Sequence, residues 1–243
     1  SGSVQGKSYV GGFTGLAKNK AVIQNCATGA ALSVTGADIV GGFMGESSTG
    51  GSTVERCVNS ATVKSKGEAG GIVGFAYLNP LSIKNCANLA DIPSSGESTE
   101  QRYRCAGGIF GRGTYGLYGA TVTITGCYSA GKVTATDGVA YGVANKNTNG
   151  GSASIQNCAY DKDVATAATA SVEGVAALTT PQLKSWAAAY ALNGSKQGTP
   201  WTYDADVNDG YPSFGTLGAP SDWGEVGLGV DAGLITGADF KPS

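Results

Sequence analysis

The cysteines are the first residues in this sequence that could do chemistry, because thiols bind metals, form disulfides and act as nucleophiles. Five of the six recur in one short element, as in residues 83–87 (IKNCA) and 155–159 (IQNCA). These five are Cys26, Cys57, Cys86, Cys127 and Cys158. Equivalent positions in a repeat form a column, which does not converge on one point as zinc ligands must.

We therefore predict a structural ladder of buried free thiols that act as small hydrophobic side chains. Disulfides between adjacent coils are the alternative, although side chains stacked in register lie farther apart than a disulfide prefers. Cys105 lies outside this register, and we expect it to be the most exposed or reactive of the six.

A second candidate site is the polar stretch of residues 91–104 and the segment that follows it. Guanidinium groups and tyrosine rings gathered there could hold an acidic or sugar ligand. The candidate binding residues are Arg102, Tyr103, Arg104, Arg112, Tyr115 and Tyr118. The alternative is an insertion whose polar side chains are simply solvated.

Calcium is the metal to consider, because Asp204, Asp206 and Asn208 alternate as the ligands of calcium loops do. However, Asp209 stands where such a loop needs glycine, and Gly215 stands where it needs a bidentate glutamate. We expect a plain turn here, with no metal and no other cofactor.

Catalysis is not expected. The chain contains no histidine, so the usual general base and the commonest nucleophile arrangements are absent. Carboxylates could still act in pairs, as in glycosidases. The candidates occupy different repeat positions, so no facing pair is predicted: Glu46, Glu55, Glu68, Asp91, Asp137 and Asp161.

The charge and hydropathy patterns exclude two further classes of partner. The net charge is −2 and the 16 Lys and Arg residues are dispersed, so no basic footprint for nucleic acid is present. No apolar stretch approaches the about 18 residues that a membrane span needs.

Two recurring elements indicate how these residues are positioned. Residues 3–15 return almost unchanged as residues 33–45, and a Gly-Gly-apolar-x-Gly element starts at residues 11, 41, 70 and 107. The element is degraded at residue 141, and the cysteine element keeps the same period. Short alternating strands between these elements cannot bury an apolar face alone, so the units must stack.

The sequence therefore predicts an all-β fold, a right-handed parallel β-helix of about five coils over residues 1–176. Each double glycine is expected at a tight corner, and residues 91–104 are expected to loop out of one coil. Residues 177–215 form the predicted C-terminal cap. It contains an amphipathic helix that starts with Thr180 as N-cap, ends at Asn193-Gly194 and covers the last coil.

The Gly-Gly-apolar-x-Gly and Asn-Cys-Ala elements resemble GLUG repeats, which occur in bacterial surface proteins and in some immunoglobulin A peptidases. The resemblance covers roughly residues 1–215 and implies an extracellular location. Residues 216–243, with Asp222-Trp223 and residues 233–237 (GLITG), resemble the opening half of an S-layer homology module, which binds cell-wall polymer. They carry three glycines within residues 224–229, where that family has a helix.

From these patterns we expect a non-catalytic extracellular surface module. It would be a scaffold or spacer, or an adhesive face for host protein or glycan. The alternatives are an accessory segment of a surface peptidase and a polysaccharide-degrading enzyme on a β-helix.

Overall fold

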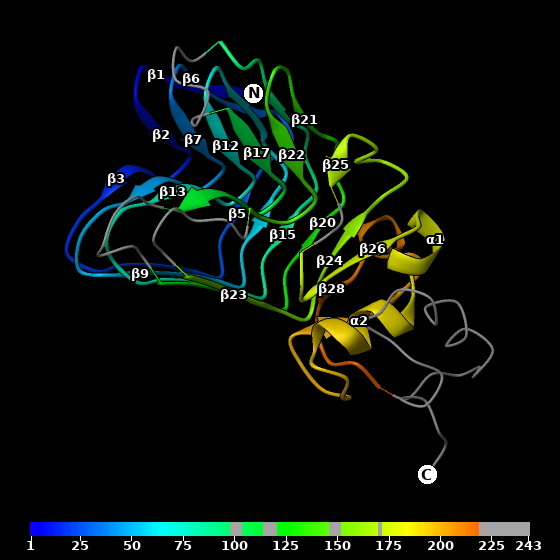
Figure 1. Ribbon diagram of the computed structural model, residues 1–243. Coiled ribbons are helices and arrows are strands. Elements are labelled where there is room, and N and C mark those ends of the chain that lie inside the picture. The colour runs from blue at the N-terminus through cyan, green and yellow to red at the C-terminus, as the bar shows by residue number, and fades with distance from the viewer. Residues whose placement is uncertain (98–103, 114–120, 146–151, 170–171, 219–243) are drawn as a thin grey trace.

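The chain winds into a parallel β-solenoid in which each coil contributes one short strand to each of up to five sheets. The computed structural model describes residues 1–97, 104–113, 121–145, 152–169 and 172–218. Successive coils stack along one axis, with two short helices beyond the last strands (Figure 1). The predicted parallel β-helix of about five coils is confirmed, whereas the hand of its winding stays a prediction.

We name the five solenoid sheets A to E in the order in which one coil visits them. Sheet A contains β1 (Gly2–Gly6), β6 (Leu32–Gly36), β11 (Thr62–Ser65), β16 (Ile92–Ser94) and β21 (Val133–Ala135). Sheet B contains β2 (Tyr9–Gly11), β7 (Ile39–Gly41), β12 (Glu68–Gly70), β17 (Cys105–Gly107), β22 (Val139–Tyr141) and β25 (Ala168–Thr169). Sheet C contains β3 (Thr14–Ala17), β8 (Met44–Ser47), β13 (Val73–Ala76) and β18 (Phe110–Gly113).

The other two solenoid sheets complete each coil. Sheet D contains β4 (Ala21–Gln24), β9 (Ser52–Glu55), β14 (Leu81–Lys84), β19 (Thr121–Thr125) and β23 (Ser152–Gln156). Sheet E contains β5 (Ala27–Thr28), β10 (Val58–Asn59), β15 (Ala87–Asn88), β20 (Tyr128–Ser129), β24 (Cys158–Asp161) and β26 (Val175–Leu178). A separate antiparallel pair, β27 (Trp201–Thr202) and β28 (Ser213–Phe214), lies in the C-terminal segment.

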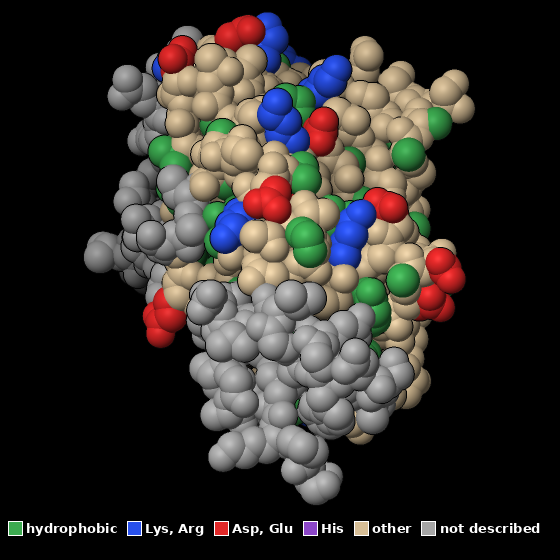
Figure 2. Space-filling model, turned by 90° about the vertical axis from the view of Figure 1, so that its right-hand side faces the viewer, with side chains coloured by type: hydrophobic (Ala, Val, Ile, Leu, Met, Phe, Trp, Pro, Cys, Tyr) green, Lys and Arg blue, Asp and Glu red, His purple; other side chains and the backbone are tan. Residues whose placement is uncertain are grey.

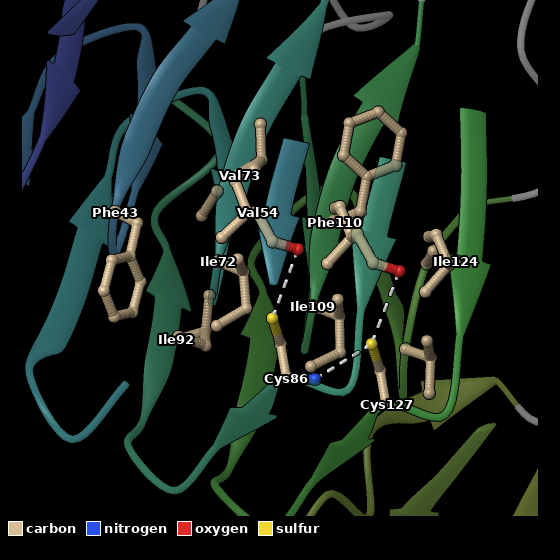
Figure 3. Close-up of a cluster of buried hydrophobic side chains, with 14 of the residues drawn as sticks. Phe43, Val54, Ile72, Val73, Cys86, Ile92, Ile109, Phe110, Ile124 and Cys127 are labelled. Carbon is tan, nitrogen blue, oxygen red and sulfur yellow. Dashed lines mark hydrogen bonds between the residues drawn. The ribbon is translucent and has the colours of Figure 1, made fainter. Parts of the chain in front are cut away.

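The core is built from columns of equivalent side chains. The strands pair in parallel and in register, so that Val34 lies over Val4 on one side and over Val63 on the other. Phe43, Ile72 and Ile109 follow the double glycines and are fully buried in another column (Figure 3). Because alternate residues of a strand point to opposite faces, each coil adds one apolar side chain to each inward column.

The double glycines lie at the corner between sheets B and C, as predicted. A methyl group at Gly41 would meet the carbonyl oxygen of Met44 and, at 2.7 Å, the backbone nitrogen of Gly74. Gly41 and Gly42 are not among the residues with positive φ. Glycine is needed here because backbone of the same coil and of the next one fills the space.

A second backbone feature explains the Asn-Cys element. The residue before each ladder cysteine has a left-handed conformation, with φ between 51° and 64°. These residues are Asn25, Arg56, Asn85, Gly126 and Asn157. Asparagine and glycine tolerate this conformation better than other residues. Their recurrence before the cysteine therefore indicates a turn between sheets D and E.

The predicted insertion of residues 91–104 is only partly a loop. Its residues Ile92–Ser94 form β16 and pair with β21 in sheet A. The prediction that the whole stretch loops out of the coil is therefore wrong for this part. Alternating burial explains why these residues form a strand and not a loop. Ile92 and Ser94 are buried, while Pro93 between them is half-buried. Residues 98–103 lie outside the described residues.

The C-terminal segment contains two short helices where one was predicted, α1 (Thr180–Leu183) and α2 (Trp186–Leu192). The N-cap of α1 is Thr179 and not Thr180, because Thr179 and Gln182 form a reciprocal capping box. Ser185 then interrupts the helix and caps α2 by accepting from the backbone of Ala188. None of the described helices combines the length and the apolar character needed to cross a membrane.

The contacts of this segment lie mainly on the side of the solenoid. Its hydrophobic cluster includes Ala87, Tyr128 and Ala159, which point outward from successive strands of sheet E. Trp201 packs against the Tyr128 ring at 5.1 Å between centroids and donates from Nε1 to the carbonyl oxygen of Gly126 at 2.7 Å. Through α1, the segment also contacts β24 and β26, the last strands of sheet E. The segment covers the outer face of sheet E.

Candidate functional site

A groove of about 720 Å³ runs along the outer face of sheet A. Its floor is one row of outward side chains, which come from equivalent positions in successive strands: Gln5, Thr35, Lys64, Pro93 and Thr134. The residues before them on the same strands, such as Val34 and Val63, are fully buried in the core. Strand alternation thus produces both the apolar core and the outward-facing groove from the same segments.

The rim of the groove carries more polar groups. Lys66, Ser95 and Thr136 follow the strands and line it from one side. The only charged residues among the described lining residues are Lys64 and Lys66, and both are exposed. Lys66 forms an ion pair with Glu97 at 2.7 Å, and both side chains are more than half exposed.

A different polar cluster fills the outer side of the corner between sheets B and C. We define this corner cluster as Glu46, Glu68, Phe75, Cys105 and Arg112. Glu68 on β12 is completely buried and accepts a hydrogen bond from Nε of Arg112 on β18. The Arg112 guanidinium also lies 5.1 Å from the centre of the Phe75 ring. The cluster thus joins two sheets and three successive coils.

Burial controls protonation in this cluster. Removal from water raises the pKa of Glu68 from its ordinary value of 4.5 to about 7, although Arg112 acts in the opposite direction. Burial also raises the pKa of Glu46. Hydrogen bonds with Ser48 and Tyr9 and the charge of Lys18 lower it by a smaller amount. The charge of Glu46 adds to the rise at Glu68, so the two carboxyl groups are close enough to interact.

The prediction that no two of the candidate carboxylates form a facing pair stays a prediction. Glu46 in sheet C and Glu68 in sheet B occupy different repeat positions, and the charge of Glu46 contributes to the raised pKa of Glu68 across the corner. Such a pair could in principle exchange a proton with a substrate. Both side chains are buried, and Glu68 has no exposed surface, so the arrangement seen here serves packing first.

Cys105 also differs from expectation. It is only 5% exposed and belongs to the corner cluster, next to Glu68 and Arg112. Burial raises the pKa of its thiol well above the ordinary value, so the reactive thiolate is disfavoured. The prediction of an exposed or reactive Cys105 is therefore wrong. The physical reason is that its strand, β17, is an ordinary member of sheet B.

The ladder cysteines stack one above another between sheets D and E, and all six cysteines of the chain are free thiols. Cys86 Sγ lies 3.6 Å from the carbonyl oxygen of Val54 in the preceding coil, and Cys127 Sγ lies 3.3 Å from the Cys86 backbone nitrogen (Figure 3). Burial raises the pKa of Cys86, Cys127 and Cys158 well above the ordinary thiol value. These thiols behave as neutral core side chains. Cys26 in the first coil is only half-buried, so the prediction of a fully buried ladder is wrong at that position.

A buried polar ladder lies two residues after the cysteines. Thr28 donates to Asn59 Oδ1 at 2.6 Å, Asn59 donates to Asn88 Oδ1 at 2.8 Å, and Asn88 donates to Ser129 Oγ at 3.2 Å. Asn59 and Asn88 are fully buried, and each also donates to a backbone carbonyl. This ladder was not predicted, although a polar residue stands two positions after four of the cysteines in the sequence.

The calcium candidates lie in the turn before β28, where their groups serve the fold. Asp204 accepts from the backbone of Asp206 at 3.0 Å, and both side chains are exposed. Asn208 directs its amide to the Tyr128 hydroxyl at 3.1 Å and to the carbonyl oxygen of Pro212 at 3.2 Å. Within the described ranges, no group of three His, Cys, Asp or Glu residues is arranged to hold a metal.

The predicted arginine and tyrosine patch is only partly described. Arg102, Tyr103, Tyr115 and Tyr118 lie outside the described residues. Arg104 is half-buried, and its carbonyl oxygen accepts from Val139 in the next coil at 3.1 Å. Arg112 is buried and paired with Glu68, so it does not present its guanidinium on the surface as a ligand-binding arginine would.

Charges on the surface near the C-terminal segment are mixed. On the face in Figure 2, lysine and arginine side chains lie among aspartate and glutamate side chains over the described surface. Comparison with protein-family models, with curated proteins and with solved structures gave no match. A proposal about function therefore rests on the repeat pattern, the groove and the buried clusters.

Proposed function

We propose that this chain is a non-catalytic extracellular module of a bacterial surface protein. Its solenoid acts as a rigid scaffold, and the groove on sheet A acts as an adhesive face for a host protein or glycan. The tail of residues 216–243 would then contact cell-wall polymer.

The observation that carries this proposal is the groove itself. It crosses successive coils, and its floor repeats one outward position of each coil. A surface that is long, open and regular suits an extended ligand, whereas a small-molecule enzyme site is usually a closed pocket with converging polar groups.

The interior supports the scaffold role. Apolar columns and the polar ladder of sheet E continue from one coil to the next, so each coil braces its neighbours. The C-terminal segment adds a brace along the side, where buried Asp161 accepts from Thr180 at 2.8 Å and from the Tyr211 hydroxyl at 2.8 Å. The resemblance of the repeats to GLUG repeats supports the extracellular location.

A polysaccharide-degrading enzyme is the second candidate, because Glu46 and Glu68 both belong to the corner cluster and burial raises the pKa of each. Carboxyl groups with shifted pKa values are typical of glycosidases. Against this candidate, Glu68 has no surface for a substrate to touch. The corner cluster would have to open before any chemistry.

The test is a binding screen of the intact chain against glycans and extracellular-matrix proteins, with product analysis for every glycan. The proposal expects specific binding to at least one member and no cleavage. Absence of binding across the screen would leave the scaffold role and reject the adhesive one. Glycan cleavage that is lost in Glu46→Gln and in Glu68→Gln would establish the enzyme.

A further inference from the structure

The chemistry of the groove on sheet A narrows the class of ligand. Each of the inner strands β6, β11 and β16 pairs in parallel with a strand on both sides, so their backbone amides and carbonyls are directed along the sheet and not out of its face. A ligand lying on this face meets side chains only, so a peptide cannot bind here by adding a strand. The described residues that line the groove also include no aromatic anchor of the kind that dominates protein interfaces.

The side chains that line the groove are suited to a hydroxylated polymer. Thr35, Thr134 and Gln5 supply hydroxyl and amide groups from the floor, and Ser95 and Thr136 supply hydroxyl groups from the rim. These groups donate and accept hydrogen bonds, as sugar hydroxyls do. Adjacent strands lie about 4.8 Å apart, so the floor position recurs at a short and constant interval along the axis, although the side chain differs from coil to coil.

The charges of the groove point to an acidic ligand. Lys64 is exposed on the floor, and within the described part of the chain no carboxylate lies within ion-pair distance of it. Lys66 lies on the rim beside it, in an exposed pair with Glu97. An exposed pair of this kind contributes at most about 1 kcal/mol, so an anionic ligand can compete with Glu97 for Lys66.

From these observations we infer that the groove on sheet A binds a linear acidic glycan, laid along the solenoid axis, whose anionic groups contact Lys64 and Lys66. This inference rests on the proposed adhesive function and specifies its ligand. The anionic groups are carboxylates or sulfates, because an ammonium group on a flexible stem contacts either as a point charge.

The first test compares two pairs of substitutions with equal charge change. Lys64→Gln with Lys66→Gln alters the groove, and Lys84→Gln with Lys162→Gln alters exposed lysines elsewhere. The probes are an oligogalacturonate, a sulfated heparin fragment and a neutral linear cello-oligosaccharide, measured by calorimetry. We expect the wild-type chain to bind an acidic probe and not the neutral one. The groove pair should bind about tenfold more weakly, as expected for two lost exposed ion pairs.

A gain of binding provides the second test. Thr35→Lys adds a cation to the groove floor, whereas Thr53→Lys adds one on the outer face of sheet D. Only the first should strengthen binding of the acidic probe, and that gain should shrink as salt is added, because salt screens exposed charges. Circular dichroism and thermal unfolding of each variant verify that the fold is retained.

The outcomes separate the two proposals. Equal losses in both lysine pairs, or equal gains in both threonine variants, would show binding to net charge and overturn the placement in the groove. If neither acidic probe binds but another member of the screen does, the proposal of an acidic glycan ligand is overturned and the adhesive function is retained. Failure of every ligand in the screen would overturn both.

Discussion

The polar ladder inside sheet E and the corner cluster outside sheets B and C solve the same problem differently. Both bury polar groups, which is costly unless the groups find partners. In the ladder, Asn59 and Asn88 bond to residues at the same position of neighbouring coils. In the corner cluster, Glu68 and Arg112 come from different positions of the repeat and are 44 residues apart.

The difference shows which buried polar side chains a repeat can place at the same position of every coil. A side chain that is both donor and acceptor can be repeated in a column, because each copy satisfies the next. A charged side chain cannot be repeated in this way, since like charges at about 4.8 Å repel one another. The buried ion pair of Glu68 and Arg112 therefore joins two different repeat positions across a corner.

The largest effect is expected from breaking the corner pair. Arg112→Met leaves Glu68 buried without its cation, which should lower the free energy of unfolding by about 3–5 kcal/mol at pH 7.5. Denaturant unfolding of the purified chain measures this. The double variant Arg112→Met with Glu68→Met removes both charges, so it should recover most of the loss. A double variant as unstable as the single one would show that the pair is not the source.

The pH dependence of stability tests the same cluster with a smaller effect. The folded chain holds a proton on Glu68 up to a pKa of about 7, whereas the unfolded chain releases it near 4.5. Its stabilising contribution is therefore complete below pH 4.5 and is lost as pH rises through 7, amounting to about 3 kcal/mol. Glu68→Gln should flatten the decline of the unfolding free energy between pH 4.5 and 7.5. Parallel curves for the two proteins would contradict this assignment.

The ladder should respond least, because its hydrogen bonds are neutral. Asn88→Ala removes the bonds to Asn59, Ser129 and the carbonyl oxygen of Ala90, and leaves buried groups without partners. The expected loss in the free energy of unfolding is about 2–3 kcal/mol. Asn88→Thr keeps a hydroxyl of the kind that Thr28 and Ser129 supply at the ladder ends, so it should lose less. Equal losses would show that packing, and not hydrogen bonding, dominates at this position.

The repeat spacing was sufficient to predict the solenoid, the double-glycine corner and the cysteine column. A constant interval places equivalent residues of neighbouring coils in contact, so these features follow from local pattern and register. The turn before each cysteine could be read in the same way, because asparagine and glycine recur where the backbone is left-handed.

Contacts between residues that are not equivalent could not be read from that spacing. The pairing of Glu68 with Arg112 and the burial of Cys105 depend on the angle between sheets B and C, which no local pattern records. The C-terminal segment likewise makes a contact between residues 75 positions apart, from Trp201 to Gly126. Its apolar side chains bury the outward apolar side chains of sheet E. Register determines which copies of one position meet, whereas contacts across a corner or onto an outer face depend on the shape of the folded chain.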